Sequence, residues 1–120
     1  MKKTLEINEL MDFYSDLLTK RQQAVMKMYY QFDYSLNEIA DNLGISKQAV
    51  SENIQRATRG LLEFEDLLGL LDKRKNQMRE KEVMLESLTK ISLLTEDKAI
   101  LEEVNKLINR IKKEGGFYGI

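Results

Sequence analysis

The residues best suited to do chemistry lie along a predicted helix from about residue 47 to residue 62. Apolar residues recur there every three or four positions, at Val50, Ile54, Ala57 and Leu61, and mark the inner face of an amphipathic helix. The polar side chains expected on the outer face are Lys47, Gln48, Ser51, Gln55, Arg56 and Arg59. Lysine and glutamine side chains can hydrogen-bond base edges, and arginine pairs with phosphate. If this helix reads DNA, Lys47, Gln48 and Ser51 in its first turns would reach base edges, and Arg56 and Arg59 would meet phosphates or flanking bases.

An acidic residue, Glu52, falls on the same outer face and would repel phosphate. Glu52 also precedes Arg56 by four residues, and Arg59 precedes Glu63 by four. At this spacing opposite charges form helix-surface ion pairs worth about 0.2–0.5 kcal/mol each. The arginines could therefore serve the helix surface alone, and both interpretations stay open.

Two further cations, Lys20 and Arg21, open an earlier predicted helix and are candidates for additional phosphate contacts. A positive charge at a helix start opposes the helix dipole, which favours an external anion there. The alternative is an ordinary solvated helix surface.

Catalysis is not expected from this composition. The chain has no histidine and no cysteine, so it lacks imidazole bases, thiolate nucleophiles and the usual zinc ligands. Its carboxylates match no catalytic motif, and no glycine-rich loop is present to hold a phosphate. We therefore expect no enzyme activity, no cofactor and no metal.

The segment from Ser35 to Leu62 has the layout of a helix-turn-helix. Ser35 and Glu38 form a capping box that opens a short helix, and Gly44 allows the left-handed turn that ends it. Ser46 is a good N-cap for the next helix. Ala40 is small enough for the two helices to cross closely near the turn.

Two helices are expected before this segment. Apolar spacing predicts the first from Thr4 to Leu18, and its inward stripe comprises Ile7, Leu10, Met11, Tyr14, Leu17 and Leu18. A second capping box, Thr19 with Gln22, opens the next helix, which runs from about residue 20 to residue 31. The side chains expected to be buried on it are Val25, Met28, Tyr29 and Phe32. For the aromatic residues near the following loop, Tyr29, Tyr30, Phe32 and Tyr34, core packing is favoured over base stacking.

The rest of the chain is predicted to be helical as well. Around Gly69 the leucines show no single face, so a helix could extend, bend or restart there. A long helix is expected over residues 73–94, with Met78, Leu85, Leu88 and Ile91 inward, and a last helix after a cap near Thr95, ending at Gly115. The sequence thus predicts an all-α protein with a helix-turn-helix domain over residues 1–66 and a C-terminal helical hairpin or extension over residues 67–120.

Charge and hydropathy suggest where such a protein works. Its 120 residues carry 19 basic and 20 acidic side chains, which give a net charge of −1. Any binding to nucleic acid must therefore rely on a local cluster of positive charge. The start has no secretory signal, and no apolar run approaches a membrane span. We expect a cytoplasmic protein that does not insert into membranes.

The stretch from Leu18 to Leu62, with LLTKRQQAVMKMYY, EIADNLGIS and AVSENIQRA, resembles region 4 of sigma-70-type factors, which binds promoter DNA with its second motif helix. This resemblance implies that Lys47, Gln48, Ser51, Glu52 and Gln55 lie on the reading face, with Arg56 nearby. Glu52 departs from the pattern, because such domains often have a basic or neutral residue there.

Nearly the whole chain, including FYSDLLTKRQQ and RGLLEFEDLLGLL, resembles the YlxM family of small bacterial helix-turn-helix proteins. The resemblance implies a regulatory protein linked to the signal recognition particle pathway, since members are encoded beside the particle's GTPase. One hypothesis is a DNA-binding regulator that forms a homodimer through its C-terminal helices. The other is an adaptor that uses the motif or the basic stretch Lys73–Lys81 to contact the particle's protein or RNA.

Overall fold

The computed structural model describes residues 2–113, and the side chains of residues 4–113. Over residues 2–113 the protein is all-α, as predicted, and contains no strand. The elements are α1 (Lys2–Tyr14), the 3-10 helix η1 (Ser15–Leu17), α2 (Lys20–Tyr30), α3 (Leu36–Leu43), α4 (Lys47–Leu68), α5 (Leu70–Leu94) and α6 (Lys98–Lys113). The chain divides into two compact units, residues 1–71 and residues 72–120.

Local capping sets the starts of α2 and α3. The Thr19 hydroxyl accepts from the Gln22 amide at 3.1 Å, and the Gln22 side chain accepts from the Thr19 amide at 3.0 Å. Ser35 and Glu38 make the same reciprocal pair, at 3.1 Å and 2.9 Å. Each pair satisfies amides that the first helical turn leaves without a backbone partner. Both predicted capping boxes are confirmed.

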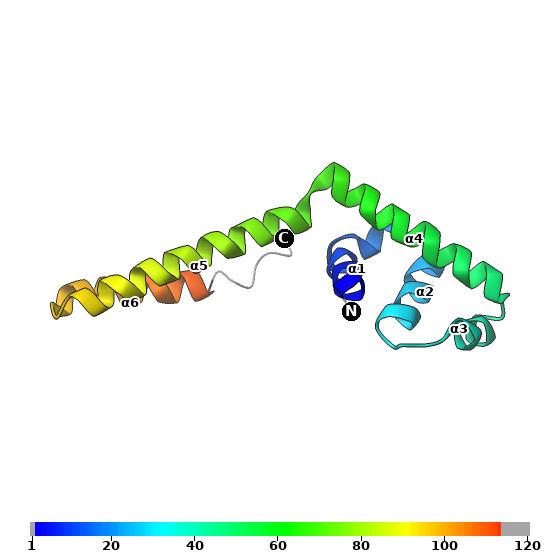
Figure 1. Ribbon diagram of the computed structural model, residues 1–120, viewed down its shortest axis with the longest axis horizontal. Helices are drawn as coiled ribbons and strands as arrows, with labels where there is room; N and C mark the ends of the chain where they lie inside the picture. Colours follow the sequence, from blue (N-terminus) through cyan, green and yellow to red (C-terminus); the bar gives the residue numbers. More distant parts are fainter. Residues whose placement is uncertain (1, 114–120) are drawn as a thin grey trace. The chain divides into compact units, whose positions relative to one another are not determined.

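Helix α4 is the centre of the first unit, because it contacts α1, α2 and α3 (Figure 1). Its buried residues, Val50, Ala57 and Leu61, are three that its periodicity predicts. Val50 belongs to a cluster with Val25, Ile39 and Ala40, whereas Ala57 and Leu61 belong to a larger cluster with α1. One helix therefore serves two small cores along its length.

The expected burial along α2 is partly wrong. Met26 is fully buried, although the pattern did not select it, while Tyr29 is 37% exposed and Phe32 is 60% exposed. Met26 packs in the core beside α1 and its neighbour Val25 packs in the core beside α3. A helix between two cores buries adjacent positions on different sides, which a single-stripe prediction misses. Phe32 is exposed because α2 ends at Tyr30, so Phe32 no longer follows the helical register.

The first helix also ends earlier than expected. The α-helix stops at Tyr14 and continues as the 3-10 turn η1, which leaves Leu17 55% exposed instead of buried. Ile7, Leu10, Met11, Tyr14 and Leu18 are buried as the spacing predicts. Around Gly69, where the sequence left open whether the helix extends, bends or restarts, the helix restarts. Gly69 has φ of 63° and ends α4, and α5 begins at Leu70.

The start of α5 is held by side chains from α1 and α4. The buried Tyr14 hydroxyl donates to Oε1 of Glu65 at 2.7 Å and accepts from the Leu70 amide at 3.0 Å. The same Glu65 oxygen accepts from the Leu71 amide at 3.1 Å. These bonds satisfy two amides of the first turn of α5 that have no helical acceptor. They hold Leu70 and Leu71 against the core that α4 shares with α1, in which Leu71 is buried.

Tyr14 should make the stability of the protein sensitive to alkaline pH. Burial raises the pKa of Tyr14 above its usual value of 10.0, and the hydrogen bond to Glu65 raises it further. Just above pH 10, Tyr14 therefore ionises in the unfolded chain but not in the folded protein. The contribution of Tyr14 to the free energy of unfolding is complete below pH 10 and is lost as the pH rises toward the pKa of Tyr14 in the folded protein. Near neutral pH we expect Tyr14→Phe to lower the free energy of unfolding by about 1–3 kcal/mol, because the Leu70 amide loses its acceptor.

Urea unfolding of both proteins at pH 8, 10 and 11 measures this dependence. The difference in free energy of unfolding between wild type and Tyr14→Phe should become smaller above pH 10. A difference that stays constant across the three pH values would contradict the assignment.

The second unit contains α5 beyond Leu71 and α6, with a reversal of direction between them (Figure 1). Asp97 caps α6, since its Oδ1 accepts from the Ala99 amide at 2.8 Å and from the Ile100 amide at 3.3 Å. Thr95, the expected cap, instead accepts from the Asp97 amide. Leu85 and Leu88 are half-buried as expected, but Met78 and Ile91 are each 43% exposed. The predicted helix end at Gly115 lies outside the described residues.

Candidate nucleic-acid interface

The turn between α3 and α4 is built by a few local interactions. Gly44 has φ of 67°, and a β-carbon placed on it would meet no atom within 4 Å. Glycine is therefore favoured for its left-handed backbone and not for lack of space. The Ile45 amide donates to the Ala40 carbonyl at 3.1 Å, which closes the end of α3. Ser46 then starts α4 by accepting from the Ala49 amide at 3.0 Å.

The angle between α3 and α4 is held by the small core of Val25, Ile39, Ala40 and Val50. Half-buried Leu36, Leu43 and Ile45 pack around it. Ala40 is 9% exposed at the crossing, and its single methyl group lets the helices approach. With one side of α4 fixed in this way, the opposite side of its first turns faces outward.

Most of the sequence-predicted site residues are exposed on α4. The exposed ones are Lys47, Gln48, Gln55, Arg56 and Arg59, and Ser51 is half-buried. We call these six residues the α4 surface. The half-burial of Ser51 follows from its position one turn before the partly buried Ile54, so it lies at the edge of this surface.

Glu52 occupies the middle of the α4 surface. It is exposed and lies four residues from both Gln48 and Arg56, which places the three side chains on one face of the helix. Within the described residues, no ion pair joins Glu52 to Arg56 or Arg59 to Glu63. Both guanidinium groups are thus available to an external anion, and the Glu52 carboxylate lies among them.

Lys20 and Arg21 are both exposed at the start of α2. A β-carbon at Gly60 would lie 3.7 Å from Cδ2 of Leu18, so the chain just before α2 packs beside Gly60 of α4. The two cations therefore lie nearer to the Arg59 end of the α4 surface than to its Lys47 end. This arrangement could extend a phosphate-binding surface past the arginines.

In the described part of the chain, no group of acidic, histidine or cysteine side chains could hold a metal ion. None of the described helices has the length and apolar character needed to cross a membrane.

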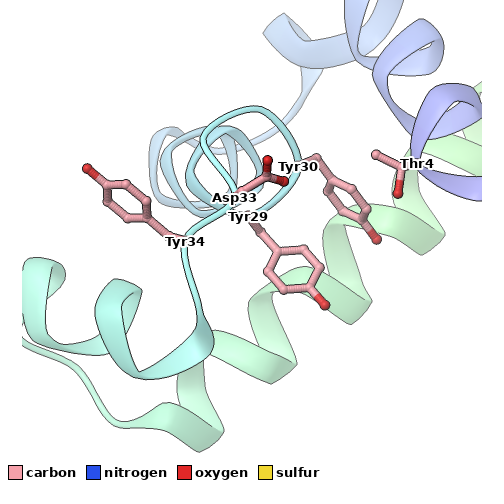
Figure 2. Close-up of a pocket in the computed structure, with 5 residues that line it drawn as sticks. All are labelled: Thr4, Tyr29, Tyr30, Asp33 and Tyr34. Atoms are coloured by element: carbon pink, nitrogen blue, oxygen red, sulfur yellow. The ribbon is translucent and has the colours of Figure 1, made fainter. Parts of the chain in front are cut away.

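Aromatic residues at the end of α2 form a feature that the sequence reasoning assigned to the core. Tyr29, Tyr30, Asp33 and Tyr34, together with Thr4 of α1, line an open pocket of about 270 Å³ (Figure 2). Tyr29 and Phe32 are exposed, and Tyr30 and Tyr34 are half-buried. The signal available in the sequence was the density of aromatic side chains around a single aspartate just after a helix.

Comparison with known proteins identifies the same motif. A family model described as "UPF0122: Putative helix-turn-helix protein, YlxM / p13 like" matches residues 1–114. A UPF0122 protein of Bacillus mycoides (strain KBAB4) is 39% identical over 113 residues, which cover 94% of this chain and 97% of the relative. A UPF0122 protein of Oceanobacillus iheyensis is 40% identical over 107 residues, covering 89% and 95%.

Proposed function

Since this chain belongs to the UPF0122 family of YlxM/p13-like helix-turn-helix proteins, we propose that it is a regulatory protein that binds duplex DNA through the α4 surface. Lys47, Gln48 and Ser51 lie in the first turns of α4, from which a recognition helix contacts base edges. Arg56 and Arg59 contact phosphates, and Lys20 and Arg21 add phosphate contacts beyond them. The observation that carries this proposal is the exposure of Lys47, Gln48, Arg56 and Arg59 opposite the buried inner face of α4.

A single module of this kind would bind weakly. The chain has a net charge of −1, so only the local cations of the α4 surface and α2 attract phosphate. Two modules linked in one dimer would bind two half-sites, and the second contact would form at high effective concentration. We therefore propose a homodimer.

The second unit supplies a dimer surface. Between residues 72 and 113, only the side chain of Val104 is buried. Val83 is 61% exposed, and with Met84, Arg79 and Glu80 it lines a shallow groove of about 440 Å³ on α5. Arg79 and Glu80 lie beside the apolar pair. A second copy related by two-fold symmetry would bring its own Val83 and Met84 against this pair and oppositely charged side chains against Arg79 and Glu80.

Glu52 favours a second candidate function. Its carboxylate opposes phosphate at the centre of the α4 surface, which suits a protein partner better than a duplex. The resemblance to the YlxM family implies the signal recognition particle pathway. In this alternative the protein is an adaptor that contacts the particle's protein or RNA, and the exposed Lys73, Lys75 and Arg79 of α5 contribute.

A salt-titrated binding comparison tests these proposals. Light scattering first measures the mass, which is 14.0 kDa for one chain and double that for the proposed dimer. Fluorescence anisotropy then compares random duplex DNA, the particle's RNA and its GTPase between about 50 and 200 mM salt. The DNA-binding function predicts duplex affinity that falls steeply with salt and rises in Glu52→Gln, because one repelled charge is removed.

Different outcomes separate the two functions. Tighter association with the GTPase or the particle's RNA than with duplex DNA would replace the first function by the second. Absence of binding to all three at micromolar concentrations would overturn both.

A further inference from the structure

The pocket at the end of α2 is separate from the α4 surface. It lies where α2 leads into α3, whereas the α4 surface begins beyond the turn at the other end of α3. Helix α3 has eight residues, so about 12 Å of helix separates its two ends. None of the six residues of the α4 surface lines the pocket.

Local backbone geometry builds the pocket. After α2 ends at Tyr30, the Phe32 amide donates to the Lys27 carbonyl at 3.1 Å and the Tyr34 amide donates to the Met28 carbonyl at 2.9 Å. Asp33 between them has φ of 56°, the one positive value among the described residues other than glycine. Aspartate and asparagine adopt this left-handed conformation more readily than other side chains. The turn thereby places the Asp33 carboxylate beside the aromatic rings (Figure 2).

Two of the tyrosine rings that line the pocket are held against each other. Tyr29 and Tyr30 meet edge to face, with centroids 4.9 Å apart and planes at 89°. Figure 2 shows both rings projecting from α2, with Thr4 of α1 beyond Tyr30, while the ring of Tyr34 projects away from them. The Tyr34 ring packs instead near Phe32, with centroids 6.2 Å apart. The pocket therefore combines the paired rings of Tyr29 and Tyr30, the Asp33 carboxylate and the Thr4 hydroxyl, and Tyr34 lines it with a ring that projects away from the other two.

This set of groups is complementary to a cation. The faces of aromatic rings carry negative electrostatic potential, and a cation within about 6 Å of a ring centroid is attracted to it. The Asp33 carboxylate adds a full negative charge, and the five lining residues that the structure describes include no lysine or arginine. The phosphate of a nucleic acid would be repelled by the same carboxylate.

We propose that the pocket of Tyr29, Tyr30 and Asp33 binds an arginine side chain of a partner protein. The guanidinium group is planar, so it can stack on a tyrosine ring while its N–H groups donate to a carboxylate. Lysine, a compact and strongly hydrated charge, satisfies both requirements less well. The site adds a protein-binding function that does not depend on whether the α4 surface binds DNA.

The proposal is tested by titrating the full-length protein with N-acetyl-arginine amide. Two-dimensional NMR of the backbone amides monitors the titration. We expect saturable shifts at the amides of residues 29–34, with a dissociation constant in the millimolar range that is ordinary for one side chain. N-acetyl-citrulline amide, which has nearly the same shape without the charge, should produce no saturable shift. Asp33→Asn keeps the turn, because asparagine tolerates the same backbone, and should weaken binding about fivefold.

A second variant guards against an effect on folding alone. Tyr29→Leu retains an apolar side chain but removes the ring, and should also weaken arginine binding about fivefold. Equal binding of citrulline amide, or wild-type affinity in Asp33→Asn, would overturn the proposal. Stronger shifts of the same amides by single-stranded oligothymidine than by arginine amide would also overturn it and favour base stacking.

Discussion

Replacing Arg56 and Arg59 together by alanine is expected to weaken binding to duplex DNA by about 10- to 100-fold at physiological salt. Both guanidinium groups are exposed, and no ion pair to Glu52 or Glu63 engages them within the described residues. Each phosphate contact that is lost removes about one unit from the slope of log affinity against log salt concentration. The slope should therefore become shallower by about two units, which fluorescence anisotropy at several salt concentrations measures.

The double variant Lys112→Ala with Lys113→Ala is the matched control. It removes the same two positive charges from the exposed last turn of α6. A loss of affinity caused only by net charge would appear in both double variants. The proposal fails if the salt slope is unchanged by the Arg56 and Arg59 substitutions, or if the control reduces it equally.

Leu61→Ala is expected to lower the free energy of unfolding by about 3–5 kcal/mol. Leu61 is fully buried and packs in the core that joins α4 to α1. Alanine there loses the transfer free energy of the leucine side chain and leaves a cavity, because close-packed neighbours relax only in part. Urea denaturation followed by circular dichroism measures the difference.

Leu67→Ala makes the same chemical change six residues further along the same helix. Leu67 is 82% exposed, so the substitution removes little packing and alanine has the higher helix propensity. We expect a change within about 0.5 kcal/mol of wild type. Similar losses in the two variants would show that the core does not close on α4 as described.

Local chemistry made several elements predictable from the sequence. The capping boxes of Thr19 and Ser35 need only a hydroxyl and a carboxylate or amide three residues later, so their geometry is contained in four consecutive residues. The left-handed turn at Gly44 is similarly local. The outer face of α4 followed from helical periodicity, because Val50, Ala57 and Leu61 leave only one side for the polar residues. The composition of the candidate DNA-binding surface was thus available without a structure.

Only the tertiary structure decided which residues close the two cores and where the pocket forms. Met26 is buried because α2 has a neighbour on each side, and Tyr14 reaches a glutamate and an amide more than fifty residues away. The exposed aromatic pocket depends on where α2 ends and on the backbone of Asp33. Sequence periodicity reports one face of one helix, whereas burial is set by every neighbour that packs against it. The sequence therefore determined the helices and their caps, and long-range packing determined the two cores and the hydrogen bonds of Tyr14 at the start of α5.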